Sequence, residues 1–173
     1  MTDDSTYTNI PNDDPQRNLT IADAETLPHI AVVGDTYTIL VHGKQTAGRY
    51  CLIDMHIPKG GGPPLHRHNF EENFTVLHGE ILVMFRDTTQ VVRAGESVNI
   101  PANAPHHFTN TKDEPARMYC TCSPAGQEEF FMQIGVPVPT RTAAPPELSA
   151  DEKKALMEKT MELAPLYATE LLV

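Results

Sequence analysis

The chain has 173 residues, a formal net charge of −10 at pH 7 and no tryptophan. This length suits one domain with a sizeable core, and the acidic balance argues against binding a nucleic-acid backbone or an anionic membrane. Small molecules and metal ions are the expected partners. The sequence has no signal-like apolar start and no run near the roughly 20 residues of a membrane span, so a cytoplasmic location is expected.

Residues 1–18 are rich in Asp, Asn, Thr and Pro, and we predict that they form a flexible N-terminal arm. Residues 19–135 are predicted to form the main domain. From about Leu19 to Cys122, short β-rich runs are separated by Gly, Pro, Asn and Asp. Many short strands at close spacing are typical of an all-β sandwich or barrel.

The predicted strands can be placed in chain order. "HIAVVGDTYTILVHG" indicates two strands around Gly34 and Asp35, and "RYCLIDMHIP" a third. "NFTVLHGEILVMFR" is interpreted as a hairpin that turns at residues 78–80. "QVVRAGESVNIPANAPHHFTN" adds two or three strands, with turns at residues 94–95 and 101–104. "ARMYCTC" is predicted to be the last strand.

Cysteine usage fits a barrel with reduced thiols. The chain has three cysteines, Cys51, Cys120 and Cys122. An odd number disfavours a disulfide framework, and a zinc ribbon would need further thiol pairs. We therefore predict free cysteines on or near core strands.

The sequence changes character after the last predicted strand. Ser123 and Pro124 suit the beginning of a helix and Gly135 suits its end. Between them "AGQEEFFMQI" places Phe130, Phe131 and Ile134 on one side, so we predict a short helix that packs on the barrel.

Residues 136–173 are predicted to form a proline-rich connector and a C-terminal helix. Ser149 with Glu152 three residues later forms a capping-box pattern, and Pro165 is expected to break the helix. Short C-terminal helices would thus follow an all-β domain.

One stretch, "GGGPPLHRHNFEENFTVLHGE", contains a pattern of metal-binding side chains. His66 and His68 are two residues apart and share one face of an extended strand, and Glu72 reaches the same point after a slight bend. Two imidazoles and a carboxylate are the ligand set of many transition-metal sites. From these residues alone, a polar surface loop with scattered histidines remains an alternative.

The surrounding spacing resembles the two signatures of the cupin superfamily. Residues 60–79 read G-x5-H-x-H-x3-E-x6-G, and residues 95–110 read G-x5-P-x-G-x2-H-x3-N with Asn103 in place of the inner glycine. That glycine serves a turn with positive φ, and Asn tolerates this conformation best among the other residues. The resemblance covers about residues 30–122, with the compact spacing of small single-domain microbial cupins.

The resemblance implies a double-stranded β-helix, or jelly-roll barrel, with a metal inside. It also supplies a fourth ligand, so that His66, His68, Glu72 and His106 would hold one divalent transition metal per chain. Such a set suits Fe, Mn, Ni or Zn, and it leaves positions open for a substrate.

Strand alternation assigns other residues to the surroundings of this centre. Glu71 and His107 are expected to face away from their ligand neighbours, and His78 is expected to be exposed at its turn. Three residues share parity with the ligands and would line the cavity or belong to the core: Phe74, Val76 and Phe108. Three further histidines are interpreted as ordinary strand residues: His29, His42 and His56.

Three functions fit the resemblance. The intact ligand set is similar to that of quercetin-dioxygenase-like cupins, which implies a mononuclear metal dioxygenase that acts on a small enol, flavonol-like or dicarbonyl substrate, with Glu72 as both ligand and catalytic base. A redox-neutral, metal-dependent cyclase or isomerase is one alternative, and a non-catalytic small-molecule-binding cupin is another. The exposed edges of an open jelly roll further predict a homodimer.

Overall fold

The computed structural model describes residues 10–172. The first strands and helices of this range are β1 (His29–Val32), β2 (Asp35–Val41), η2 (Gly43–Thr46), β3 (Cys51–Ile57), β4 (His66–His68), β5 (Glu71–His78), β6 (Glu80–Phe85) and β7 (Thr88–Arg93). They are followed by β8 (Ser97–Ile100), β9 (His106–Thr109), β10 (Ala116–Ser123), α1 (Gln127–Ile134), β11 (Val136–Val138), α2 (Ala150–Leu163), η3 (Ala164–Tyr167) and β12 (Thr169–Leu171).

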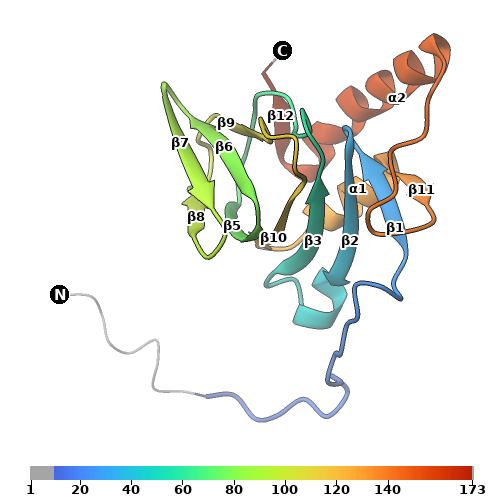
Figure 1. The fold of residues 1–173 in the computed structure, drawn as a ribbon. Coiled ribbons are helices and arrows are strands. Elements are labelled where there is room, and N and C mark those ends of the chain that lie inside the picture. Colours follow the sequence, from blue (N-terminus) through green and yellow to red (C-terminus); the bar gives the residue numbers. More distant parts are fainter. Residues whose placement is uncertain (1–9, 173) are drawn as a thin grey trace.

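Two antiparallel sheets form the body of the molecule, as Figure 1 shows. Within the described range, one sheet has the strand order β11-β1-β2-β3-β10-β5-β8 and the other has the order β12-β4-β9-β6-β7. Large apolar side chains such as Ile53, Phe74, Ile81 and Met118 fill the space between the sheets and are almost fully buried. The predicted jelly-roll barrel is therefore confirmed.

The predicted hairpin at residues 78–80 is wrong. β5 pairs with β10 and β8 in the larger sheet, whereas β6 pairs with β7 and β9 in the smaller one. The chain passes from one sheet to the other at Gly79, which has a φ of 70° and lies so close to Ala116 that a Cβ atom would sit 3.1 Å from the Ala116 Cα. Alternation of apolar residues is the same on both sides of a hairpin and of a sheet crossing, so the pattern does not separate them.

The other predicted strands are present, but "ARMYCTC" is not the last one. It forms β10, and the C-terminal segment adds β11 on the edge of the larger sheet and β12 on the edge of the smaller sheet. Each of these strands has three residues. Three residues are too few to show an alternation of apolar and polar side chains. These segments become strands because they pair with an existing sheet edge, and not because of a local sequence pattern.

Helix α1 begins later than predicted. Ser123 is still part of β10, where it pairs with Glu71, and the helix follows Gly126. Gly135 ends the helix as predicted, but its φ of −72° is extended and not left-handed. A small residue is needed there for space, because a Cβ atom would lie 2.8 Å from the Ile30 side chain.

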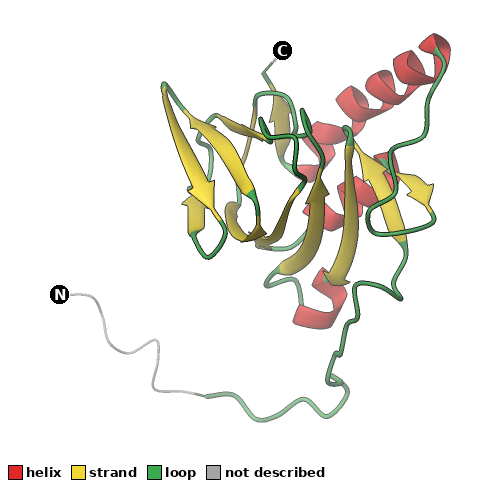
Figure 2. Cartoon of the chain, in the orientation of Figure 1, coloured by secondary structure: helices red, strands yellow, loops and turns green. Residues whose placement is uncertain are grey.

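Helix α2 matches the prediction closely. The Ser149 hydroxyl accepts a hydrogen bond from the Glu152 amide while the Glu152 carboxylate accepts one from the Ser149 amide, so the capping box is formed. The helix ends at Leu163, and Pro165 lies in the following 3-10 turn. Figure 2 shows both α-helices beside the part of the larger sheet that holds β1 and β2.

Part of the predicted N-terminal arm, residues 1–9, lies outside the described residues. Residues 10–28 contain neither a helix nor a strand, and most of their side chains are exposed. The boundaries at residues 18 and 135 stay predictions. None of the helices among the described residues has the length and apolar character that crossing a membrane requires.

Candidate metal centre

The four side chains predicted to bind a metal converge inside the barrel. His66 and His68 come from β4, Glu72 from β5 and His106 from β9, and all four are buried. One nitrogen or carboxylate oxygen from each lies within 4.8 Å of the corresponding atoms of the others. His66 and His106 are directly opposed on neighbouring strands, so the sheet itself sets the spacing of these two imidazoles.

Backbone carbonyls orient all three imidazole rings. The Nδ1 atoms of His66, His68 and His106 lie 2.9 Å from the carbonyl oxygens two residues away at Pro64, Phe70 and Ala104. A carbonyl oxygen only accepts hydrogen bonds, so each Nδ1 carries the proton. In the neutral ring, Nε2 then presents a lone pair toward the other members of the cluster, which is the arrangement that metal-binding histidines adopt.

The donor atoms fit one divalent ion. The Oε2 atom of Glu72 lies 3.1 Å from the His68 Nε2 and 3.0 Å from the His106 Nε2. Bonds of about 2.1 Å to a shared ion place neighbouring donors about 3 Å apart. Lone pairs and a carboxylate at this distance repel one another unless a cation lies among them, so the donor set and its spacing both suit a transition metal.

The charges in this cluster are strongly coupled. Burial by itself raises the pKa of Glu72. In the protonated form of the rings, however, His106 and His68 donate hydrogen bonds from Nε2 and carry positive charge, and together these outweigh burial and hold the pKa of Glu72 well below its usual value. Burial and the neighbouring His106 lower the pKa of His66 to about 4. Glu72 is therefore ionised and His66 is neutral near pH 7, and these are the forms that bind metal.

Two thiols contact the other oxygen of Glu72. The Sγ atom of Cys120 lies 3.3 Å from the Glu72 Oε1, and that of Cys122 lies 3.8 Å away. As predicted, the three cysteines are free and buried. Sequence reasoning took them only as core residues and missed this contact. The contact depends on the register of the β5–β10 pair, in which Cys122 is directly opposite Glu72, and the sequence does not show that register.

The glycine-rich loop before β4 is held close to the barrel. Gly62 has a φ of 127°, and a Cβ atom there would lie 2.0 Å from the Phe108 carbonyl oxygen, so only glycine fits. The Gly60 amide donates to the Asn110 carbonyl at 2.7 Å, and the buried Asn110 amide group donates to the carbonyls of Ile57 and Glu114. Asn110, the last residue of the second motif, thus holds the loop that precedes His66 against the barrel by hydrogen bonds.

Asn103, the departure from the second motif, adopts the conformation that was expected of glycine. Its φ is 69°. The Asn103 amide also donates to the His68 carbonyl at 2.6 Å. The turn between β8 and β9 therefore contacts the strand that carries two candidate ligands.

The remaining histidines and Glu71 lie outside the cluster. Glu71 is exposed and accepts hydrogen bonds from the Asn99 side chain and the Ala102 amide. His78 is exposed beside Glu114, and His29 is buried with its Nδ1 atom 2.7 Å from the Thr38 hydroxyl. Three others, which are partly buried, do not join the four: His42, His56 and His107.

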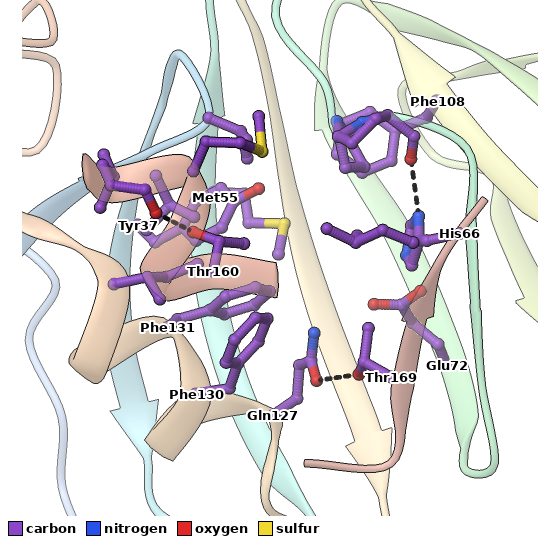
Figure 3. Close-up of a pocket in the computed structure, with 18 of the residues that line it drawn as sticks. Tyr37, Met55, His66, Glu72, Phe108, Gln127, Phe130, Phe131, Thr160 and Thr169 are labelled. Carbon is purple, nitrogen blue, oxygen red and sulfur yellow. Dashed lines mark hydrogen bonds between the residues drawn. The ribbon is translucent and has the colours of Figure 1, made fainter. Parts of the chain in front are cut away.

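A cavity of about 360 Å³ opens beside the cluster. Figure 3 shows His66, Glu72 and Phe108 on one side of it, with Tyr37, Phe130, Phe131 and Thr160 on the other. Phe108 lines the cavity as predicted, whereas Phe74 and Val76 belong to the core. Sequence reasoning missed the walls supplied by α1, α2 and β12, because alternation around the motifs carries no information about where the later segments pack.

Comparisons with known proteins agree with this fold. Residues 53–122 match the family model of the cupin domain. An uncharacterized protein of Methanocaldococcus jannaschii is 27% identical over 104 residues, which is 59% of this chain and 83% of that protein.

Solved structures give the same result for the barrel. An RmlC-like cupin from Shewanella frigidimarina has 19% identity and a TM-score of 0.57 over 66% of this chain and 98% of that one. A predicted oxalate decarboxylase from Thermotoga maritima has 16% identity and a TM-score of 0.56 over 60% and 98% of the two chains. These similarities concern the fold, and the resemblance to quercetin-dioxygenase-like cupins stays a prediction.

Proposed function

We propose that this chain, which contains a cupin domain, is a mononuclear metal dioxygenase that acts on a small enol, flavonol-like or dicarbonyl substrate. One observation carries the proposal: three imidazoles and one carboxylate converge inside the barrel, and two of the four, His66 and Glu72, line a mostly apolar cavity. A divalent metal held there would act as a Lewis acid toward a substrate hydroxyl and offer open positions for dioxygen.

The protein's own residues provide orientation and a dry environment. The carbonyls of Pro64, Phe70 and Ala104 fix the ring directions of the three histidines. Apolar side chains such as Met55, Phe108 and Phe131 line the cavity and keep water from the reacting group. Exclusion of water strengthens electrostatic interactions in the site and limits side reactions of a reactive substrate.

Glu72 is the candidate base because it is the buried carboxylate at the cavity end. Its lowered pKa keeps it ionised, which a proton acceptor requires, but the contacts with His68 and His106 also make it a weak base in this position. We infer that Glu72 Oε2 accepts the substrate's hydroxyl proton after the carboxylate rotates away from the two imidazoles.

The test is oxygen consumption by protein loaded with Fe, Mn or Ni, measured with a panel of flavonols, enediols and 1,3-dicarbonyl compounds. Glu72→Gln should abolish uptake, because an amide does not accept the proton. Glu71→Gln is the matched control, since this neighbouring carboxylate is exposed and points away from the cluster. Uptake that persists unchanged in Glu72→Gln would remove Glu72 as the base.

Two other functions would be favoured by other outcomes. Absence of oxygen uptake with every metal and substrate would argue for a redox-neutral cyclase or isomerase, or for a non-catalytic binding protein. Product analysis by mass spectrometry separates these two, because a cyclase or isomerase changes the substrate without adding oxygen and a binding protein leaves it unchanged.

A further inference from the structure

We propose that the ligand of this site is an amphiphilic small molecule with an oxygen-donor chelating head and an apolar body of about the size of an aromatic ring or larger. We further infer that the C-terminal segment, and not the cupin barrel alone, selects that body. The inference rests on the proposed metal site and adds the class of molecule that the site takes.

The size and lining of the cavity support an apolar body. Its volume of about 360 Å³ falls in the range of small-molecule pockets, which is about 300–1,000 Å³. The cavity runs from His66 and Glu72 to Phe130 and Phe131. A small chelator such as a two-carbon acid would fill only the metal end and leave the aromatic end empty.

Most polar groups along the cavity already have partners inside the protein. The Thr169 hydroxyl contacts the Gln127 side chain at 3.3 Å, as Figure 3 shows, and the Thr160 hydroxyl donates to the Leu156 carbonyl at 2.7 Å. The Tyr37 hydroxyl donates to Asp35 at 3.2 Å. The Gln127 side-chain nitrogen is the donor of this set that these contacts do not use. A second polar group placed away from it would lose its hydrogen bonds to water without replacement, and this loss disfavours binding.

Lys153 is the one further charged residue of the lining, and it lies at the exposed beginning of α2. An exposed ammonium group remains hydrated, so it does not make the interior polar. The polar end of the ligand therefore belongs at His66 and Glu72, and its apolar body belongs between the barrel and the helices.

Helix α2 forms one wall of the cavity, and its packing leaves room for a ligand. The helix contains no fully buried residue, although Leu156 and Thr160 face the cavity and are half-buried. An amphipathic helix normally buries its apolar side against a filled core. Here Leu156 and Leu163 pack only partly against the core, and Leu156 also lines the cavity, which an apolar ligand body would fill. The helix also lies outside residues 53–122, so the wall is a feature added to the cupin domain.

The experiment compares two ligands with the same head and different bodies. Acetylacetone and benzoylacetone both chelate through a 1,3-dicarbonyl group. Calorimetry under nitrogen measures their binding to the Ni(II)-loaded protein, because without dioxygen neither compound is oxidised. Benzoylacetone should bind about tenfold or more tightly, because the cavity buries its phenyl ring. Equal affinity for the two compounds would overturn the inference.

Two variants of α2 separate the cavity from general hydrophobicity. Thr160→Phe adds a ring to the wall of the cavity. Met161→Phe adds the same ring at the next residue, which lines a neighbouring hollow and not the cavity itself. Thr160→Phe should remove the tenfold advantage of benzoylacetone and leave acetylacetone binding unchanged, whereas Met161→Phe should change neither. Identical behaviour of the two variants would overturn the inference. Met157→Trp repeats the test from the same wall if Thr160→Phe folds poorly.

A metal-free measurement keeps this inference distinct from the proposed function. Fluorescence of 1-anilinonaphthalene-8-sulfonate added to the apo protein reports the apolar compartment alone, and it should fall in Thr160→Phe but not in Met161→Phe. Equal fluorescence in both variants would overturn the apolar site even if Ni(II) binds. Failure to bind Ni(II) while the fluorescence difference persists would overturn the proposed function and the chelating head, and would leave the apolar compartment standing.

Discussion

The thiol of Cys120 lies 3.3 Å from Oε1 of Glu72, the carboxylate oxygen that faces away from the imidazoles of His68 and His106. Because burial raises the pKa of Cys120 to about 12, the thiol stays protonated, and its S–H group donates a hydrogen bond to the carboxylate. This hydrogen bond holds Glu72 with its other oxygen toward the candidate metal position.

Replacing Cys120 should therefore weaken metal binding. Groups that orient a metal-binding side chain contribute about 10–100-fold to affinity, and a thiol is a weak donor, so Cys120→Ala should cost about tenfold. Cys120→Ser keeps a donor and should retain most of the affinity. Competition with a chelating dye measures the constants, and Cys51→Ala is the control because Cys51 has no hydrogen bond to Glu72. Equal affinities for Cys120→Ala and wild type would contradict this role.

The cluster itself predicts about one divalent transition ion per chain. His66→Ala and His106→Ala each remove a donor from a buried set of four, so metal content should fall strongly in both. His107→Ala is a matched control, since His107 neighbours His106 on β9 but does not join the cluster. Elemental analysis of protein purified without chelator gives the answer, and full occupancy in both variants would reject the site.

One part of this cluster was predictable from local alternation, and the rest followed from the resemblance to the cupin signatures. His66 and His68 share a strand face whatever the rest of the chain does, and the second motif added His106. The contact of Cys120 with Glu72 was not predictable, because it depends on how two strands pair whose residues are 48 positions apart. Register follows from the whole sheet, and a single sequence does not contain it in readable form.

The helices illustrate the same limit. The capping box of Ser149 and Glu152 marks where α2 begins, and that feature is local. The place of α2 beside the metal cavity depends on β12, which pairs with β4 and draws the end of the chain to the site. A three-residue strand is too short for its sequence to indicate its pairing partner. The position of the C-terminal segment beside the cavity was therefore not predictable from the sequence.

Substitutions of Asn103 should show how much its left-handed backbone conformation matters for the turn that contacts β4. Its φ of 69° is one that residues with a Cβ atom adopt at a cost of about 1–2 kcal/mol, although Asn pays less than most. Asn103→Gly should keep the unfolding free energy within about 0.5 kcal/mol, while Asn103→Ala should lower it by about 1 kcal/mol. Urea unfolding of the two variants provides the comparison. An alanine variant as stable as the glycine variant would show that the turn does not need this backbone conformation.

Pairing of β12 with β4 should stabilise the metal centre. Thr169 is opposite His68 and Leu171 is opposite His66, and the Leu172 amide donates to the Leu65 carbonyl at 2.9 Å. Removal of the chain after Ala168 exposes this strand edge, and we expect a loss of about 2 kcal/mol because several hydrogen bonds of about 0.5–1.5 kcal/mol each are broken. Metal affinity should fall with it, as a chelator titration would measure.

A milder variant controls for the loss of a surface charge in that truncation. Glu170→Ala removes only the exposed ion pair with Arg67, which should contribute less than about 1 kcal/mol. A truncated chain that matches Glu170→Ala in urea unfolding and in metal affinity would show that β12 is dispensable for the centre.

Asp35 should make stability fall as pH rises. Its side chain is fully buried, and Oδ1 has no hydrogen-bond partner among the described residues. Burial raises the pKa of Asp35 to about 8 from an ordinary value of 3.8, while the hydrogen bond from Tyr37 opposes this rise. The folded chain therefore retains a proton that the unfolded chain has lost between these two values. The contribution of Asp35 is fully present below the unfolded pKa and is lost progressively as pH rises to about 8.

The matching variant is Asp35→Asn, which keeps an acceptor for Tyr37 and does not titrate. In chelator-containing buffer, where metal loss plays no part, urea unfolding at pH 5, 6.5, 8 and 9 measures both proteins. The unfolding free energy of the variant minus that of wild type should increase by about 1.4 kcal/mol per pH unit up to about pH 8 and then level off, since each retained proton contributes that slope. All other titrating groups are common to both proteins and cancel in the difference. A difference that does not change with pH would mean that Asp35 is ionised in the folded chain throughout this range.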